Sequence, residues 1–164
     1  MSEDHKRVWD VIETVGVCML TTRFDGDTGG GLRARPVEPR PDRDAGLIFV
    51  VTDVRSHKEH EIEAVHDIGL VFIDAKAKAY LSITARAQVL HDHAKAAEIW
   101  KSTDNLWWDG PDDPNVCVLR IEPVTAELWD GPASKAVAVY EIARAKLTGA
   151  KPNLGENRKV TVRM

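Results

Sequence analysis

The chain has 164 residues with a formal net charge of -4, and 43% of the residues are hydrophobic, which fits one globular domain. An acidic balance disfavours a nucleic-acid partner, because such partners are held by a basic face. No stretch approaches the roughly 18 apolar residues of a membrane span, and no signal-peptide pattern opens the chain, so we expect a cytoplasmic protein. Cys18 and Cys117 lie in apolar runs and are expected to be buried thiols.

The N-terminal part of the chain predicts one helix followed by strands. Val8, Val11 and Ile12 recur at helical spacing behind Ser2, a good N-cap residue, so residues 1–16 are expected to form a helix. Apolar and β-branched runs, separated by the polar loop 25–31 and the turn-rich segment 39–46, predict strands over 17–22, 32–38 and 47–52. Three neighbouring strands favour an antiparallel meander.

The rest of the chain continues with short helices and strands. Ser56-His57-Lys58-Glu59 has the Ser-x-x-Glu form of a capping box, so a helix is predicted to begin at Ser56. Further helices are expected over 92–100 and 134–147. The predicted strands are 68–73, 80–90, 116–121 and 126–129, with a bend at Glu122-Pro123, and a β-prone segment 159–163 follows the loop 149–157.

These elements predict a mainly β fold. Short strands outnumber helices, so we expect an antiparallel β-barrel of six or seven strands with peripheral helices. The glycine-rich segment 26–31 lacks the order G-x-G-x-x-G and precedes a strand, which disfavours a doubly wound nucleotide-binding sheet. We expect a single domain over residues 1–164, with a C-terminal helix and tail in 131–164.

Two groups of basic residues are candidates for binding an anion. Lys58 lies in the first turn of the predicted helix, where unpaired backbone N–H groups favour a phosphate. Arg33 and Arg35 alternate along one predicted strand, so both guanidinium groups face the same side of the sheet. The alternatives are that Ser56 only caps its helix beside a solvated Lys58, and that the two arginines form a solvent-facing side.

The histidines suggest little metal chemistry. His57 and His60 have helical i, i+3 spacing, and His91 and His93 flank an aspartate, but neither pair has an evident third ligand in sequence. We therefore expect surface histidines and no metal site.

Several short segments together resemble the pyridoxamine 5′-phosphate oxidase-like split barrels. They are Ala34-Arg35-Pro36-Val37, then Phe49-Val50-Val51-Thr52-Asp53, then Ser56-His57-Lys58. Trp107-Trp108 and Glu127-Leu128-Trp129-Asp130 are similar to the general stress protein branch of that superfamily. The segments occur in the family's order over roughly residues 5 to 130. The resemblance implies an FMN-binding split barrel that forms a homodimer with the flavin at the interface.

The resemblance also implies a role for individual residues. Ser56, His57 and Lys58 would hold the flavin phosphate, while Arg35, Pro36 and Val37 would border the ring or the ribityl chain. Val51 and Thr52 would line the ring. The resemblance further implies Tyr80 and Ser82 as ring contacts, and Trp107, Trp108 or Trp129 as a cover from the partner subunit.

The implied function is that of a general stress protein with FMN-dependent oxidoreductase chemistry and an unknown small-molecule substrate. Alternatives are a non-catalytic flavin-binding or flavin-sensing protein, or a barrel that uses FAD, a deazaflavin or haem. True pyridoxamine phosphate oxidase activity is not expected, because no dedicated set of residues for pyridoxal phosphate is identified.

Overall fold

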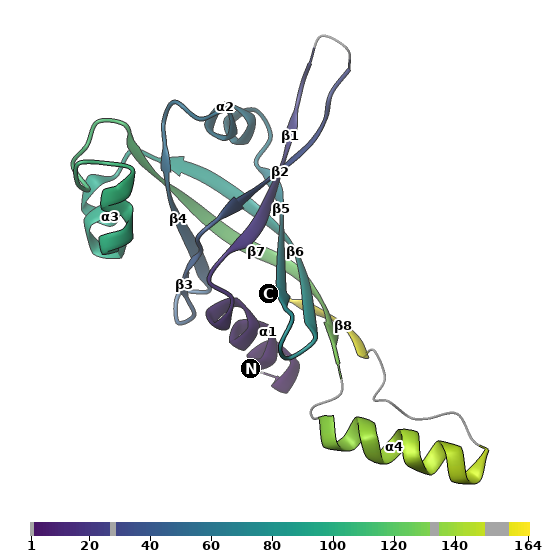
Figure 1. Cartoon of the computed structure of the whole chain (residues 1–164). Coiled ribbons are helices and arrows are strands. Elements are labelled where there is room, and N and C mark those ends of the chain that lie inside the picture. Colours follow the sequence, from purple (N-terminus) through teal and green to yellow (C-terminus); the bar gives the residue numbers. More distant parts are fainter. Residues whose placement is uncertain (1, 27–28, 132–134, 150–157) are drawn as a thin grey trace.

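The computed structural model describes residues 2–26, 29–131, 135–149 and 158–164. The polypeptide forms one eight-stranded antiparallel sheet accompanied by helices (Figure 1). The predicted mainly β fold is confirmed. Part of the predicted loop 25–31 and most of the loop 149–157 lie outside the described residues. Within the described ranges, no helix is long and apolar enough to cross a membrane.

The helix α1 (Glu3–Thr14) confirms the predicted N-terminal helix. Ser2 is its N-cap, and the Ser2 side chain accepts a hydrogen bond of 3.2 Å from the backbone N–H of His5. Val8, Trp9, Val11 and Ile12 are buried on one face. This face packs against the sheet, where α1 contacts β5 (Asp67–Asp74), β6 (Ala79–Leu90) and β8 (Arg158–Arg163). The helix therefore covers one end of the sheet (Figure 1).

The sheet follows the order β2-β1-β5-β6-β7-β4-β3, with β8 beside β7. The remaining strands are β1 (Cys18–Phe24), β2 (Gly31–Val37), β3 (Arg40–Asp42), β4 (Leu47–Asp53) and β7 (Val116–Asp130). β1 and β2 form a hairpin that extends away from the rest of the sheet (Figure 1).

Two features differ from the sequence-based expectation of six or seven strands. The segments 116–121 and 126–129 are one continuous strand, β7, rather than two strands joined by a bend. Pro123 is tolerated there because it pairs with Ala85 just beyond the register shift between Thr84 and Ala85, where a bulge disrupts the ladder. The turn-rich segment 39–46 contains the short strand β3, which pairs with β4 as a hairpin.

The main core lies between the sheet and α1, and it is built from residues that alternate along the strands. β6 shows this pattern most clearly, because its side chains are alternately buried and exposed over most of its length. Both cysteines are buried free thiols, as predicted. Burial raises the pKa of each thiol to about 12.

The other helices lie around the sheet. α2 (His57–Ala64) contacts β1 and β6, and α3 (His93–Ile99) contacts β4 and β7. A 3-10 helix spans Ser102–Leu106, and α4 (Lys135–Thr148) confirms the predicted C-terminal helix. In Figure 1, α2 lies at the opposite end of the sheet from α1, and this end carries most of the candidate site.

Candidate functional site

The start of α2 places Ser56 and Lys58 where the sequence predicted an anion site. Ser56 is the N-cap, but its side chain makes no capping hydrogen bond. The predicted capping box is therefore wrong: the Ser56 N–H bonds to the carbonyl of Asp53 at 3.1 Å, and the Glu59 carboxylate lies near His91 instead. As a result, Ser56 Oγ is buried without a hydrogen-bond partner among the described residues.

Lys58 is half-buried, and no carboxylate lies within 4.0 Å of its Nζ in the part of the chain that the structure describes. Burial lowers the pKa of Lys58, and the positive charge of Arg35 lowers it further. An anion at this position would offset both effects. The first turn of α2 thus combines an unpaired cation, an unpaired buried hydroxyl and the positive end of a helix dipole.

Arg33 and Arg35 face the same side of β2, as predicted, and both are held by Glu61 of α2. Arg33 Nη1 donates to Glu61 Oε1 at 2.7 Å, and Arg35 Nη2 donates to Glu61 Oε2 at 2.6 Å. Thr22 of β1 also donates to Glu61 and accepts from Arg35. This network fixes the Arg35 guanidinium near Lys58 and ties the β1–β2 hairpin to α2.

Glu61 itself is buried. Burial acts to raise the pKa of Glu61, but the hydrogen bonds from Thr22 and Arg35 outweigh it and lower the pKa overall. Sequence reasoning missed this residue. In the sequence, the one local sign that Glu61 is buried is its position next to the apolar Ile62. The arginines that pair with Glu61 come from a distant strand, so the sequence does not show them.

Val51 and Thr52 are both buried on β4, and Thr52 pairs with Cys117. Trp108 packs against the apolar cluster that contains Val51. The Trp108 indole N–H donates to Asp53 Oδ2 at 3.3 Å, which holds the ring beside the end of β4. The hydrogen bond from Arg55 is the main reason that the pKa of Asp53 falls to about 2.

Four of the other predicted site residues lie on the outer face of the sheet: Pro36, Tyr80, Ser82 and Trp129. Pro36 pairs with Met19, Ser82 pairs with Val71, and Tyr80 pairs with Trp129. Trp129 lies twelve positions beyond Cys117 on β7, which corresponds to about 40 Å along an extended strand. Cys117 lies near Lys58, because it pairs with Thr52 at the end of β4 and acts electrostatically on the Lys58 ammonium. Within one chain, Trp129 and its neighbour Tyr80 are therefore remote from Lys58. Val37 is buried in the main core, and His57 is exposed at the start of α2.

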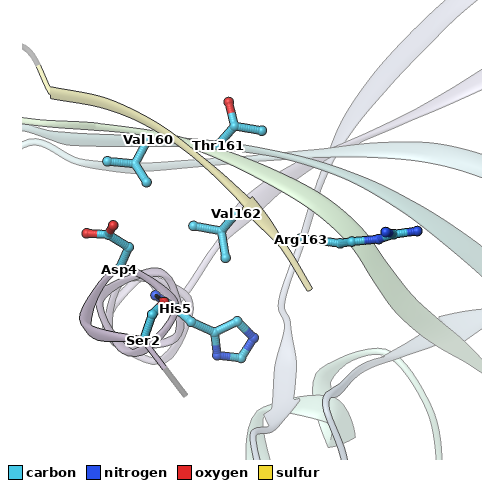
Figure 2. Close-up of a pocket in the computed structure, with 7 residues that line it drawn as sticks. All are labelled: Ser2, Asp4, His5, Val160, Thr161, Val162 and Arg163. Carbon is cyan, nitrogen blue, oxygen red and sulfur yellow. Dashed lines mark hydrogen bonds between the residues drawn. The ribbon is translucent and has the colours of Figure 1, made fainter.

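Two cavities, one beside α2 and one beside α1, differ in whether the predicted flavin-binding residues line them. A cavity of about 300 Å³ lies between the β1–β2 hairpin and α2, and its lining includes Arg33, His57 and Glu61. A larger cavity of about 560 Å³ lies between the start of α1 and β8 (Figure 2). None of the predicted flavin-binding residues lines the larger cavity, whereas His57 lines the smaller one.

The chain matches the family described as pyridoxamine 5′-phosphate oxidase like over residues 3–153. It is 29% identical to general stress protein 26 of Bacillus subtilis over 90 residues, which make up 53% of this chain and 64% of that protein, or slightly less than two thirds of its length.

Solved structures of related proteins have the same fold as this chain. The crystal structure of a general stress protein 26 from Jannaschia sp. CCS1 superposes with a TM-score of 0.76 at 28% identity, covering 98% of this chain and 97% of that one. A pyridoxamine 5′-phosphate oxidase-related, FMN-binding protein from Nostoc punctiforme PCC 73102 superposes with a TM-score of 0.63 at 14% identity, covering 79% and 85%.

Proposed function

Because the chain belongs to the pyridoxamine 5′-phosphate oxidase-like family, we propose that it is an FMN-binding protein of the general stress protein branch, with flavin-dependent oxidoreductase chemistry. The observation that carries the proposal is the pair of unsatisfied polar groups at the start of α2, Ser56 Oγ and the Lys58 ammonium. The single-domain organisation and the cytoplasmic location expected from the sequence belong to the same proposal.

The residues at the start of α2 fit a phosphate. Ser56 Oγ would donate to a phosphate oxygen, Lys58 would supply the charge, and the free N–H groups of the first helical turn would add further donors. Arg35 adds positive potential from β2 while Glu61 fixes its position. Glu61 is thus a positioning residue, which keeps the Arg35 side chain from folding away from the site.

The neighbouring strands fit the rest of a flavin. Val51 and Thr52 of β4 would line the ring, while Arg35, Pro36 and Val37 would border the ring edge or the ribityl chain. Trp108, held by Asp53, supplies an aromatic surface next to β4. A bound flavin supplies hydride or electron transfer, and the protein supplies its placement and the electrostatics around it.

An exposed apolar face supports the proposed homodimer. Met19, Val71, Ile73 and Tyr80 are 37%, 37%, 55% and 49% exposed on the outer side of β1, β5 and β6. The register places Met19 opposite Val71 and Ile73 opposite Tyr80, so these side chains form one continuous surface. A second copy of the chain would cover it, and Tyr80, Ser82 and Trp129 would then approach the partner's flavin site rather than their own.

The nature of the cofactor and its chemistry are tested on the purified protein. Chromatography of the cofactor released by denaturation distinguishes FMN from FAD, a deazaflavin and haem, and the proposal predicts FMN. The loaded protein is then mixed anaerobically with NADH or NADPH, followed by a quinone or nitro-aromatic acceptor. Reduction and prompt reoxidation are expected. A bound flavin that neither nicotinamide reduces would instead indicate a binding or sensing protein.

A further inference from the structure

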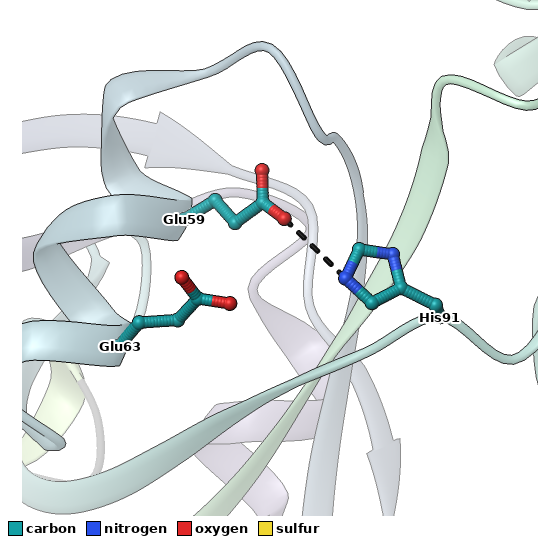
Figure 3. Close-up of side chains that lie close together, drawn as sticks. All are labelled: Glu59, Glu63 and His91. Carbon is teal, nitrogen blue, oxygen red and sulfur yellow. Dashed lines mark ion pairs between the residues drawn. The ribbon is translucent and has the colours of Figure 1, made fainter.

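We propose that Glu59, Glu63 and His91 form a binding site for a divalent first-row transition metal ion, of which Zn²⁺ is the best probe. The two glutamates lie on α2, and His91 follows the end of β6 (Figure 3). One ligand atom from each of the three residues lies within 4.8 Å of the others. The proposed site is separate from the flavin-phosphate site, and it does not depend on flavin binding.

The helix presents two carboxylates to one histidine. Glu59 and Glu63 are four residues apart, so they lie above one another on the same helix face. His91 Nε2 lies 3.5 Å from Glu59 Oε1, which places the imidazole on that face (Figure 3). Carboxylate oxygens and imidazole nitrogens are both donors that Zn²⁺ accepts, and three protein ligands leave a fourth position for water.

The burial of Glu59 is the independent observation that points to a cation. Glu59 is only 6% exposed, and a buried carboxylate requires a compensating charge or hydrogen bonds. Over the described ranges of the chain, no lysine or arginine lies within 4.0 Å of the Glu59 carboxylate, whose ion-pair partner is His91. Glu61 on the same helix shows the contrast, because two arginines neutralise it.

Glu59 also does not form the capping-box hydrogen bond that its position in the sequence predicts. As the third residue after the N-cap, it would bond back to the Ser56 N–H in a capping box. That N–H is occupied by the carbonyl of Asp53 at 3.1 Å, and the Glu59 carboxylate lies toward His91. The side chain is thus directed away from the helix start and toward the cluster.

The cluster needs only a small adjustment to hold one ion. Ligand atoms about 2.0–2.2 Å from a tetrahedral Zn²⁺ lie roughly 3.3 Å from one another. Glu63 and His91 are both exposed, so their side chains are free to move closer to Glu59 by rotation about their side-chain bonds. The bound ion would link α2 to the segment after β6 and thereby hold the helix whose first turn carries Lys58.

Calorimetric titration of the full chain with Zn²⁺ tests the proposal, using protein without a histidine tag that has been stripped with a chelator. We expect one Zn²⁺ per chain and a rise in melting temperature on binding. Loss of outer partners alone weakens metal sites about 10- to 100-fold, so His91→Ala and Glu63→Gln should each weaken binding by at least about tenfold.

His60→Ala is the matched control, because His60 is an exposed histidine on the same helix that the cluster does not include. It should bind Zn²⁺ like the unsubstituted protein. Because the substituted residues are exposed, none of these variants should lose its fold. Absence of saturable binding, equal binding by His91→Ala and Glu63→Gln, or a loss of binding in His60→Ala would each overturn the proposal.

Discussion

Replacing Lys58 by alanine is the most informative perturbation of the proposed flavin site. Lys58 is half-buried beside Arg35, and its lowered pKa shows that the free ammonium is held in an unfavourable environment. A phosphate would relieve this, and a charge-assisted contact contributes about 1.5–3 kcal/mol, so Lys58→Ala should raise the Kd for FMN roughly ten- to a hundredfold. Riboflavin lacks the phosphate, and its Kd should change little.

The assay is quenching of flavin fluorescence, measured for both ligands with both proteins. Lys6→Ala serves as the matched control, because it removes one positive charge from the exposed side of α1, at the other end of the sheet (Figure 1). The ion pair between Lys6 and Glu3 is exposed on the surface and contributes little to stability, so its loss should not affect the fold. An equal loss for FMN and riboflavin, or the same loss in Lys6→Ala, would refute the phosphate role of Lys58.

Three further predictions concern the fold and the dimer. Because burial raises the pKa of Cys18 and Cys117 to about 12, neither thiol should ionise or react with a disulfide reagent at pH 8 until the protein unfolds, and labelling of the native protein would contradict this. Asp104→Ala removes the buried carboxylate that accepts from Arg40 at 2.7 Å and leaves the guanidinium only its contacts with Glu38, so it should lower the free energy of unfolding in urea by about 3 kcal/mol. A loss below about 1 kcal/mol would refute the importance of this pair. Ile73→Lys places a charge on the exposed apolar face and should convert a dimer to a monomer in sedimentation, whereas an unchanged dimer would exclude this face as the interface.

Local patterns in the sequence were sufficient to predict most of the elements. The apolar spacing of Val8, Val11 and Ile12 predicted α1, and the strand predicted over 80–90 corresponds to β6. The continuous strand β7 could not be predicted in the same way. Pro123 suggests a break when read in the sequence alone. The strand stays unbroken because the register with β6 shifts beside Pro123, where Thr84 pairs with Thr125 and Ala85 pairs with Pro123, and this shift appears only when the two strands pair.

In the candidate site, too, the residues placed by local sequence could be predicted, and those brought together by the tertiary fold could not. Lys58 was predictable because its position in a helical first turn is a local property. The network of Glu61 with Arg33 and Arg35 was not, because it requires the β1–β2 hairpin to pack against α2. His91 likewise meets Glu59 only through the fold. In the sequence its nearest histidine is His93, and no metal site was expected there; His93 Nδ1 lies 2.8 Å from the carbonyl of Pro111.

The central claim, that this chain binds FMN through the start of α2, is tested most directly by titrating the purified protein with FMN, riboflavin and FAD. Fluorescence quenching and the visible absorption spectrum report binding of each flavin. The account predicts saturable binding at micromolar or tighter Kd with a preference for FMN. Absence of saturable binding by all three flavins would contradict it.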